Sequence, residues 1–345
     1  MNFKLEHIDI EINHRCNLKC RHCSAKAGDG FHSGELSSEE IKTILSNARP
    51  LGLRKVGLTG GEPLFDERKL EEVARFCVNE LHVPIHTHFN GTMITEDLCK
   101  PGGVISLFKS ASITFLGGDA ATHDFMTEVK GSFDKTLEGV KLMAQYALPL
   151  TVYYIPTSGT CASYKELTPV LHALGVKRIR AMALAPSGRA RTIYGETAPS
   201  PQEMVQFEID LLEARSSLNI QVEAGYCTRL SMPRLQVLSG HEVCMSGRNR
   251  VHINSAGDVF PCTAASGVEE LKLGNLKEVS WNISDIWNNS DLLQRRRAVH
   301  LGKVDACENC PIEVKCKQGC LVNACGTMSD GARRNCPVLN TLVPA

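Results

Sequence analysis

Short apolar runs recur through the first two-thirds of the 345-residue chain, and stretches with helical periodicity separate most of them. Runs of this length that are rich in β-branched residues predict strands, and strands that alternate with helices predict parallel βαβ units. We therefore expect an α/β fold built on a barrel-like parallel sheet. The expected strands cover residues 8–12, 56–59, 85–89, 113–115, 150–155, 179–183 and 220–223.

Capping residues mark where several helices begin. Ser37 and Glu40 form a capping-box pattern ahead of an apolar stripe with helical spacing. Ser200 and Glu203 open another helix in the same way, with a proline between them at the first helical position. Cys77 lies on the apolar face of a further helix pattern. We expect it to be a core residue and not a metal ligand, because free cysteine is among the most buried residue types.

Composition indicates a large folded chain without a polyanionic partner. Hydrophobic residues make up 43% and charged residues 22% of the sequence, enough for one large domain and a smaller one. Lys+Arg and Asp+Glu are equal at 38 each, so no global field attracts nucleic acid or an acidic membrane. No signal peptide or membrane-spanning run is evident, and we expect a cytoplasmic protein. The 15 cysteines then favour metal binding over disulfides.

Three of these cysteines, Cys16, Cys20 and Cys23, lie together in the run RCNLKCRHC. Their spacing allows three thiolates to hold a 4Fe–4S cluster while one iron keeps no protein ligand. An iron of this kind can bind a substrate or a cofactor. A structural zinc site completed by His14 and His22 is the alternative, although such sites usually have four ligands arranged as two close pairs.

A second motif, KVGLTGGEP at residues 55–63, ends an expected strand in two glycines and a carboxylate. Gly60 and Gly61 would let backbone groups approach a ligand closely, because no side chain intervenes. The carboxylate of Glu62 could then pair with an amine. A tight turn after the strand explains each glycine individually. It does not explain why the motif accompanies the cysteine loop.

Together, the CxxxCxxC loop and the strand that ends in GGEP resemble the radical S-adenosylmethionine (radical SAM) superfamily. The resemblance implies a partial (β/α)6 barrel, which we assign to residues 1–225, with chemistry at the carboxyl ends of the strands. It implies S-adenosylmethionine bound to the open iron of a 4Fe–4S cluster. It also implies that Gly60, Gly61 and Glu62 hold the amino group of the methionine moiety, and that His22 packs near the adenine.

Weaker motifs follow in the order that the superfamily shows along the chain. Asn90 ends the third expected strand, and Thr114 takes the usual hydroxyl position in the fourth. Arg189 stands in a P-x-G-R turn of the kind that relatives place beside the adenosine, although an arginine in a loop can also be merely exposed. The resemblance assigns these three residues to cofactor binding, and their order along the chain supports it.

Two positions depart from the pattern of the superfamily. Leu116 stands where relatives usually have an aspartate, and Thr127 stands where an arginine often meets the methionine carboxylate. Lys130 could supply the missing positive charge three residues later. We include Lys130 among the expected cofactor-binding residues as a hypothesis.

The last third of the chain carries a second cysteine array. Its seven members are Cys244, Cys262, Cys307, Cys310, Cys316, Cys320 and Cys336. Their spacing resembles the SPASM extension of radical SAM enzymes, and we assign this domain to residues 226–345. Seven thiolates are too many for one cluster and suit two auxiliary clusters, which we expect to be of the 4Fe–4S type. The interleaved pattern of the subgroup implies that Cys307, Cys310, Cys316 and Cys336 hold one cluster and that Cys244, Cys262 and Cys320 hold the other.

The second auxiliary cluster lacks an obvious fourth ligand. Some relatives place a further cysteine six positions after the first, where this chain has Arg250. Cys227, Cys325 or an exogenous ligand could fill the position, and a site without a fourth protein ligand would let substrate bind the iron. A zinc ribbon is the alternative for the cysteines between 307 and 320.

The resemblance implies an enzyme of the maturase type, which cleaves S-adenosylmethionine reductively and abstracts hydrogen from a substrate. Auxiliary clusters suit a net oxidation, and oxidative maturation of a ribosomally made peptide, such as crosslinking, is our first hypothesis. Side-chain chemistry on a tetrapyrrole or haem-type cofactor is the second. Peptide epimerisation is a third, with Cys227 as a possible hydrogen donor. An iron–sulfur electron carrier is the non-enzymatic alternative, but a carrier has no use for an amine-binding carboxylate.

The partners follow from the same hypotheses. Sulfatase maturation is disfavoured, because Thr263 stands where those enzymes carry an aspartate. Only fifteen residues precede Cys16, so we expect no amino-terminal peptide-recognition domain. A separate recognition protein or a small-molecule substrate would account for that. The cluster needs a reductant such as flavodoxin or ferredoxin, and we expect no nucleic acid or membrane partner.

Overall fold

The computed structural model describes residues 3–28, 34–225, 232, 234, 235, 244–300 and 322. Their strands form one sheet in the order β10-β9-β8-β1-β2-β3-β4-β5-β6-β7. The strands are β1 (His7–Glu11), β2 (Lys55–Thr59), β3 (Ile85–Phe89), β4 (Ser110–Phe115), β5 (Leu150–Tyr154), β6 (Arg178–Ala181), β7 (Gln221–Ala224), β8 (Arg250–Ile253), β9 (Asp258–Phe260) and β10 (Gly274–Asn275).

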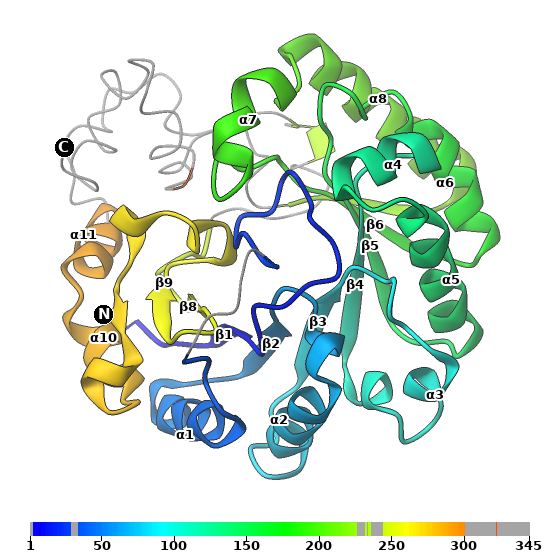
Figure 1. Cartoon of the computed structure of the whole chain (residues 1–345). Coiled ribbons are helices and arrows are strands. Elements are labelled where there is room, and N and C mark those ends of the chain that lie inside the picture. The colour runs from blue at the N-terminus through cyan, green and yellow to red at the C-terminus, as the bar shows by residue number, and fades with distance from the viewer. Residues whose placement is uncertain are drawn as a thin grey trace.

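The first seven strands are parallel neighbours in chain order, as the alternation of strands and helices predicts. Each expected strand overlaps an observed one, and the largest difference is β4, which begins three residues earlier, at Ser110. The sheet curves but does not close, because β7 and β10 are its edges within the described residues. The fold is therefore a partial barrel, and Figure 1 shows most of the helices around the outside of the curved sheet.

The helices begin where the capping patterns predict. The side chains of Ser37 and Glu40 form the capping box of α1, and those of Ser200 and Glu203 form that of α8. Cys77 is fully buried on α2, as expected of a core residue. The helices are α1 (Ser38–Ala48), α2 (Glu67–Asn79), α3 (Glu96–Cys99), α4 (Ala120–Thr127), α5 (Ser132–Gln145), α6 (Tyr164–Ala173), α7 (Ala190–Thr197), α8 (Pro201–Leu218), α10 (Ile283–Asn289) and α11 (Asp291–His300).

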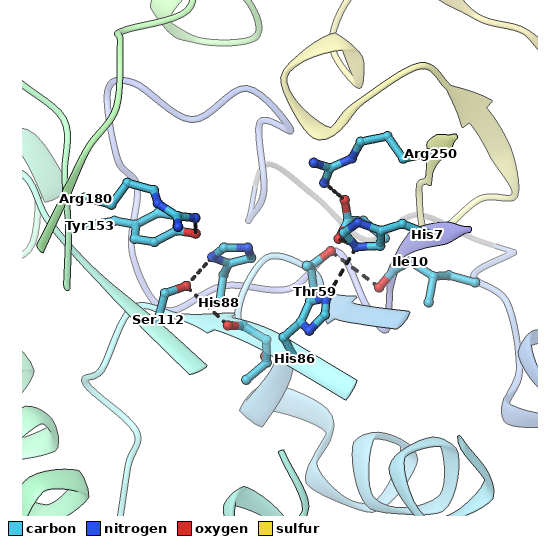
Figure 2. A network of polar contacts seen from close by, with 11 residues as sticks. His7, Ile10, Thr59, His86, His88, Ser112, Tyr153, Arg180 and Arg250 are labelled. Atoms are coloured by element: carbon cyan, nitrogen blue, oxygen red, sulfur yellow. Dashed lines mark hydrogen bonds and ion pairs between the residues drawn. The ribbon is translucent and has the colours of Figure 1, made fainter. Parts of the chain in front are cut away.

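The two faces of the parallel sheet differ in polarity. In β1 the fully buried Ile8 and Ile10 alternate with His7, Asp9 and Glu11. Parallel strands covered on both faces usually read as continuous apolar runs. Here the apolar face packs under the helices, and the inner face of the barrel is polar (Figure 2). Inner-face residues of the other strands include His86, His88, Ser112, Tyr153, Arg180 and Glu223, whereas Val56, Leu58, Ile113, Val152, Ile179 and Val222 belong to the buried core.

The carboxyl-terminal segment joins the barrel sheet directly. β8 pairs in parallel with β1, and β9 and β10 extend the sheet in antiparallel pairs. The sheet is therefore continuous from the barrel into the region that follows residue 243, while the assigned boundary between residues 225 and 226 stays a prediction. Of the helices that the structure describes, none has both the length and the hydropathy to cross a bilayer.

Candidate cluster and cofactor site

The loop that follows β1 carries Cys16, Cys20 and Cys23 as half-buried thiols. Burial raises the pKa of Cys16 to about 11, with further contributions from the charges of Glu62 and Cys23. Burial raises the pKa of Cys20 well above its usual range, and Cys23 and Cys16 raise it further. Three thiols are thus gathered where the negative charges of their thiolate forms would repel one another. Bound iron would compensate that repulsion and favour the thiolates, so the donor set fits an iron–sulfur cluster.

The zinc alternative finds no support in the described residues. In the ranges 3–28, 34–225 and 244–300, no three His, Cys, Asp or Glu side chains converge on a point that could hold one metal ion. The Nε2 atom of His14 lies 3.2 Å from the carbonyl oxygen of Lys26. His14 therefore holds the cysteine loop together.

The two glycines of the GGEP motif receive the cysteine loop. The N–H of Gly61 donates to the carbonyl of Asn13 at 3.0 Å, and the N–H of Glu62 donates to that of Arg15 at 2.8 Å. A Cβ atom on Gly61 would lie 2.3 Å from the Arg15 carbonyl oxygen, and one on Gly60 would lie 2.7 Å from that of Asn13. The missing side chains thus allow the cysteine loop itself, and not only a ligand, to approach closely.

Glu62 links the ends of β2 and β3 to this loop. Its carboxylate is fully buried and accepts hydrogen bonds from the N–H of Leu64 at 3.1 Å and that of Asn90 at 2.7 Å. Burial raises its pKa to about 7. The side-chain amide of Asn90 donates to Oδ1 of Asn17 at 2.8 Å and lies 3.8 Å from Sγ of Cys16. Since each carboxylate oxygen has two lone pairs, Glu62 keeps acceptor capacity for an amine.

Arg189 holds the other side of the cysteine loop. Its Nε donates to the carbonyl of Cys20 at 2.8 Å, its Nη1 to that of Ala27 at 3.0 Å, and its backbone N–H to that of Cys23 at 2.9 Å. A Cβ atom on Gly188 would lie 2.3 Å from the Cys23 carbonyl oxygen. The alternative of an exposed loop arginine is wrong: the turn after β6 is fastened to the cysteine loop.

His22 lies beside Arg189 within the same loop. Its Nδ1 is buried and has no hydrogen-bond partner in the part of the chain that the structure describes. Burial lowers its pKa to about 4, and the charges of Arg189 and His123 lower it further. A neutral imidazole with an unused buried nitrogen fits contact with a heterocycle such as adenine.

The remaining positions expected near the cofactor are Thr114, Leu116, Thr127 and Lys130. Thr114 is half-buried on β4, and Leu116 is buried just after it. Thr127 is buried, with its hydroxyl 2.6 Å from that of Ser132, and its carbonyl accepts from the N–H of Lys19. Lys130 is exposed between α4 and α5, and no described contact brings it to the cysteine loop. The structure therefore gives the Lys130 hypothesis no support.

Of the expected auxiliary ligands, Cys244 and Cys262 lie among the described residues, and both are half-buried. Cys244 precedes β8, and Cys262 follows β9. Positive charge gathers there. Arg248 and Arg296 are each 1% exposed, and burial followed by the charge of Arg296 lowers the pKa of Arg248 to about 10, against the opposing effect of Cys244. A guanidinium near a thiol favours the thiolate, so this environment fits an anionic cluster. The expected ligands Cys307, Cys310, Cys316, Cys320 and Cys336, and the candidates Cys227 and Cys325, lie outside the described residues.

The other described cysteines serve the core. Cys77, Cys99 and Cys161 are buried, and none of the eight cysteines within the described residues is disulfide-bonded.

Sequence reasoning missed the loop contacts of Asn13 and Asn17 and the polar inner face. In Figure 2, His88 and Ser112 point toward one another, and His7 and Arg250 lie farther along the same face of the sheet. The strict alternation of polar and apolar residues in stretches such as HIDIE and IHTHF was the available signal. This alternation means that one face of each strand is polar, so apolar side chains do not fill the inner face of the sheet.

Comparison with known protein families finds a match for each of the two expected domains. Residues 10–159 match the model described as the radical SAM superfamily, and residues 244–311 match the SPASM model, described as an iron–sulfur cluster-binding domain. The expected α/β barrel with a cysteine-rich carboxyl-terminal domain is thereby confirmed.

Individual relatives cover most of the chain. It is 25% identical over 320 residues to the AdoMet-dependent heme synthase of Methanosarcina barkeri, covering 86% of this chain and 87% of that protein. It is 24% identical over 293 residues to the PqqA peptide cyclase of Granulibacter bethesdensis, covering 83% and 75%. The crystal structure of Streptococcus suis SuiB bound to S-adenosylmethionine aligns with a TM-score of 0.72 at 19% identity, covering 94% of this chain and 74% of SuiB. At this identity the structural likeness shows the fold alone.

Proposed function

The chain belongs to the radical SAM superfamily and carries a SPASM domain, and from this premise we propose that it abstracts hydrogen from a substrate in an oxidative maturation reaction. The family makes it an enzyme whose cofactors are S-adenosylmethionine, a 4Fe–4S cluster and auxiliary iron–sulfur clusters. The observation that carries the proposal is the junction at Asn90, which binds Glu62 through its backbone and reaches Cys16 through its side chain.

When bound, the cluster and S-adenosylmethionine supply reductive cleavage of a sulfonium and a 5′-deoxyadenosyl radical that attacks a C–H bond. The cysteine loop would hold the iron, and Glu62 would accept hydrogen bonds from the N–H groups of the methionine amine. His22 presents an uncharged ring to the adenine. The full burial of Glu62 keeps water away from its carboxylate. We keep Gly60, Gly61, Asn90, Thr114 and Arg189 as proposed cofactor-site residues.

The experiment is anaerobic reconstitution with iron and sulfide, followed by incubation with S-adenosylmethionine and a strong reductant. We expect 5′-deoxyadenosine from the wild type and at least a tenfold slower rate from Glu62→Gln, since a neutral amide accepts a weaker hydrogen bond from an amine than a carboxylate does. Glu67→Gln, which alters an exposed carboxylate on α2, is the matched control. A wild-type protein that retains its cluster but forms no 5′-deoxyadenosine would return the chain to the electron-carrier alternative.

For the substrate we propose a ribosomally made peptide that is crosslinked with the loss of two hydrogens. The PqqA peptide cyclase relative supports this choice, and the auxiliary clusters suit the uptake of an electron from a substrate radical. Mass spectrometry of short peptides encoded beside the gene tests it directly. Retention of mass with inversion of one residue would instead indicate epimerisation, for which Cys227 is the proposed hydrogen donor.

A tetrapyrrole substrate is the second candidate, and one observation favours it. Burial lowers the pKa of Lys55 on the inner face, and the charges of Arg250 and Arg180 lower it further. Positive groups that lie near one another suit a substrate with carboxylate side chains. The heme synthase relative points to the same chemistry. Loss of carbon dioxide from an iron porphyrin that carries propionate groups, with peptides unchanged, would select this candidate.

The remaining proposals concern the surroundings of the reaction. We propose that the protein works in the reducing cytoplasm, with flavodoxin or ferredoxin as electron donor and a separate recognition protein if the substrate is a peptide. The equal numbers of acidic and basic residues, 38 each, give no support to a nucleic-acid partner. Reduction of the cluster by purified flavodoxin tests the donor.

A further inference from the structure

Arg250 is the first residue of β8, which pairs with β1 of the barrel on one side and with β9, the strand before Cys262, on the other. Its Nη2 is 2.5 Å from Oδ2 of Asp9 on β1. Burial would lower its pKa, but the charge of Asp9, and then those of Cys262 and Cys244, raise it above the usual range. Its Nε is buried and has no hydrogen-bond partner in the described ranges. Strand pairing supports this neighbourhood, because Ser246 pairs with Arg250, and His252 pairs with Phe260 just before Cys262. The guanidinium therefore pairs with a carboxylate near two thiols and keeps one N–H donor unused.

Asp9 is held firmly in this position. Its side chain is 3% exposed, and its Oδ1 accepts from Nε2 of His7 at 3.0 Å. A Cβ atom on Gly57 of the neighbouring strand would lie 2.1 Å from Oδ1, so the carboxylate occupies space that only a glycine leaves open. The resulting chain of contacts runs from Arg250 through Asp9 to His7 and then to His86. Figure 2 shows Arg250, His7 and His86 in this series.

We propose that Arg250 sets the reduction potential of the auxiliary cluster that Cys244 and Cys262 help to hold, and that Asp9 positions Arg250 for this role. Reduction adds a negative charge to a cluster, and a neighbouring cation with a free N–H donor stabilises the reduced form. The guanidinium thus raises the midpoint potential and makes the cluster a better electron acceptor. The inference rests on the auxiliary cluster of the proposed function, and not on the identity of the substrate.

A second ion pair on the inner face provides the matched control. Arg180 donates to Glu223 through Nε at 3.0 Å and to Tyr153 through Nη1 at 3.0 Å. Burial lowers its pKa, but the charges of Tyr153 and Glu223 raise it above the usual value. The auxiliary cysteines are not among the groups that shift this pKa. Arg180 and Arg250 are similarly exposed, at 23% and 24% of their side-chain surfaces. They differ mainly in whether the cluster is a neighbour.

The test is a redox titration of the anaerobically reconstituted full-length holoenzyme, read by electron paramagnetic resonance. The auxiliary signal is identified as the one that Cys262→Ala removes. At the potential that half-reduces the wild type, we expect Arg250→Gln to lower the ratio of reduced to oxidised cluster by about tenfold, equivalent to ~59 mV for one electron. Arg250→Lys should restore most of the ratio, because it restores the charge, and Arg180→Gln should leave it within about twofold of the wild type.

Arg250→Gln leaves Asp9 buried without its partner, which can prevent folding. The double variant Asp9→Asn/Arg250→Gln removes both charges and should still shift the potential downward, because the guanidinium is the nearer charge to the cluster. An unchanged potential in a folded variant, or an equal shift in Arg180→Gln, overturns the inference. If the wild type shows iron at the first cluster but no signal that depends on Cys262, the auxiliary cluster of the proposed function fails together with this inference. If the signal is present and Arg250 does not affect it, only the inference fails.

Discussion

The two cysteine sites of this chain are built by different means. At the first site, three thiols share one loop, and backbone hydrogen bonds from Gly61, Glu62 and Arg189 fasten that loop to the ends of neighbouring strands. At the second, Cys244 and Cys262 flank a pair of strands, and charged guanidiniums surround them. The first site is therefore determined by steric fit, and the second by electrostatics. Steric changes should destroy the first, whereas charge changes should adjust the second.

The largest expected effect is at Gly61. A Cβ atom there would lie 2.3 Å from the Arg15 carbonyl oxygen, so Gly61→Ala must displace the cysteine loop at a cost of about 3 kcal/mol or more. We expect iron content at the first site and formation of 5′-deoxyadenosine to be lost. Gly195→Ala is the control, because a Cβ atom on Gly195 would meet nothing within 4 Å. Normal iron binding by Gly61→Ala would contradict the steric account of the first site.

Cys262→Ala should separate the two sites. We expect it to remove one auxiliary cluster and substrate oxidation while the enzyme still forms 5′-deoxyadenosine, since the three thiols of the first site lie on a separate loop. Iron quantification together with an assay for 5′-deoxyadenosine checks this. Loss of S-adenosylmethionine cleavage in the folded variant would show that the sites depend on one another.

The burial of Glu62 predicts a pH dependence of stability in the cluster-free protein. Its pKa rises from 4.5 to about 7, so the folded state favours the protonated form. The associated stability is fully present below pH 4.5 and is lost as the pH rises to about 7. The loss is about 3 kcal/mol, because one pKa unit corresponds to 1.36 kcal/mol. Urea unfolding between pH 5 and 8 should show Glu62→Gln gaining stability relative to the wild type up to about pH 7 and then levelling off. If the free energy of unfolding had the same pH dependence in the wild type and in Glu62→Gln, the shifted pKa would be contradicted.

Arg189→Gln should weaken the first site without abolishing it. It removes charge-assisted hydrogen bonds to the carbonyls of Cys20 and Ala27, each worth about 1.5–3 kcal/mol. We expect the cluster to be lost to a chelator roughly tenfold faster than in the wild type. Arg191→Gln, on the exposed side of α7, is the control and should behave like the wild type.

The smallest expected effect is at Lys130. Because its side chain is exposed and makes no described contact with the cysteine loop, Lys130→Ala should change S-adenosylmethionine affinity less than about twofold. Equilibrium binding to the reconstituted protein measures this. A clear loss of affinity would restore the hypothesis that Lys130 pairs with the methionine carboxylate.

Much of the fold was predictable because its signals are local. The capping boxes at Ser37 and Ser200 depend on residues three positions apart, and each expected strand overlaps an observed one. The polar alternation in HIDIE was also visible in the sequence. The alternation alone did not show where the polar residues lie. A polar face inside a barrel and a polar face exposed to solvent give the same pattern, and only the curvature of the sheet distinguishes them.

The contacts of the candidate site were less predictable. The glycines of GGEP predicted close approach, but the group that approaches is the carbonyl of Arg15 and not a cofactor alone. Arg189 was an arginine in a loop until folding brought it to Cys20, 169 residues away. Lys130 was the nearest cation to Thr127 in sequence, yet its side chain is exposed to solvent.

The sequence by itself determined the chemistry available to this protein: three thiols on one loop, a buried carboxylate after a strand, and a second cysteine array. These depend on residue type and short spacing, which act through local backbone geometry. Only the tertiary structure decided what surrounds them. The pairing of β8 with β1 brings Arg250 to Asp9 across 241 residues, because sheet order and not sequence distance sets which charges are neighbours. The physical reason is that a charge or a steric contact acts through space.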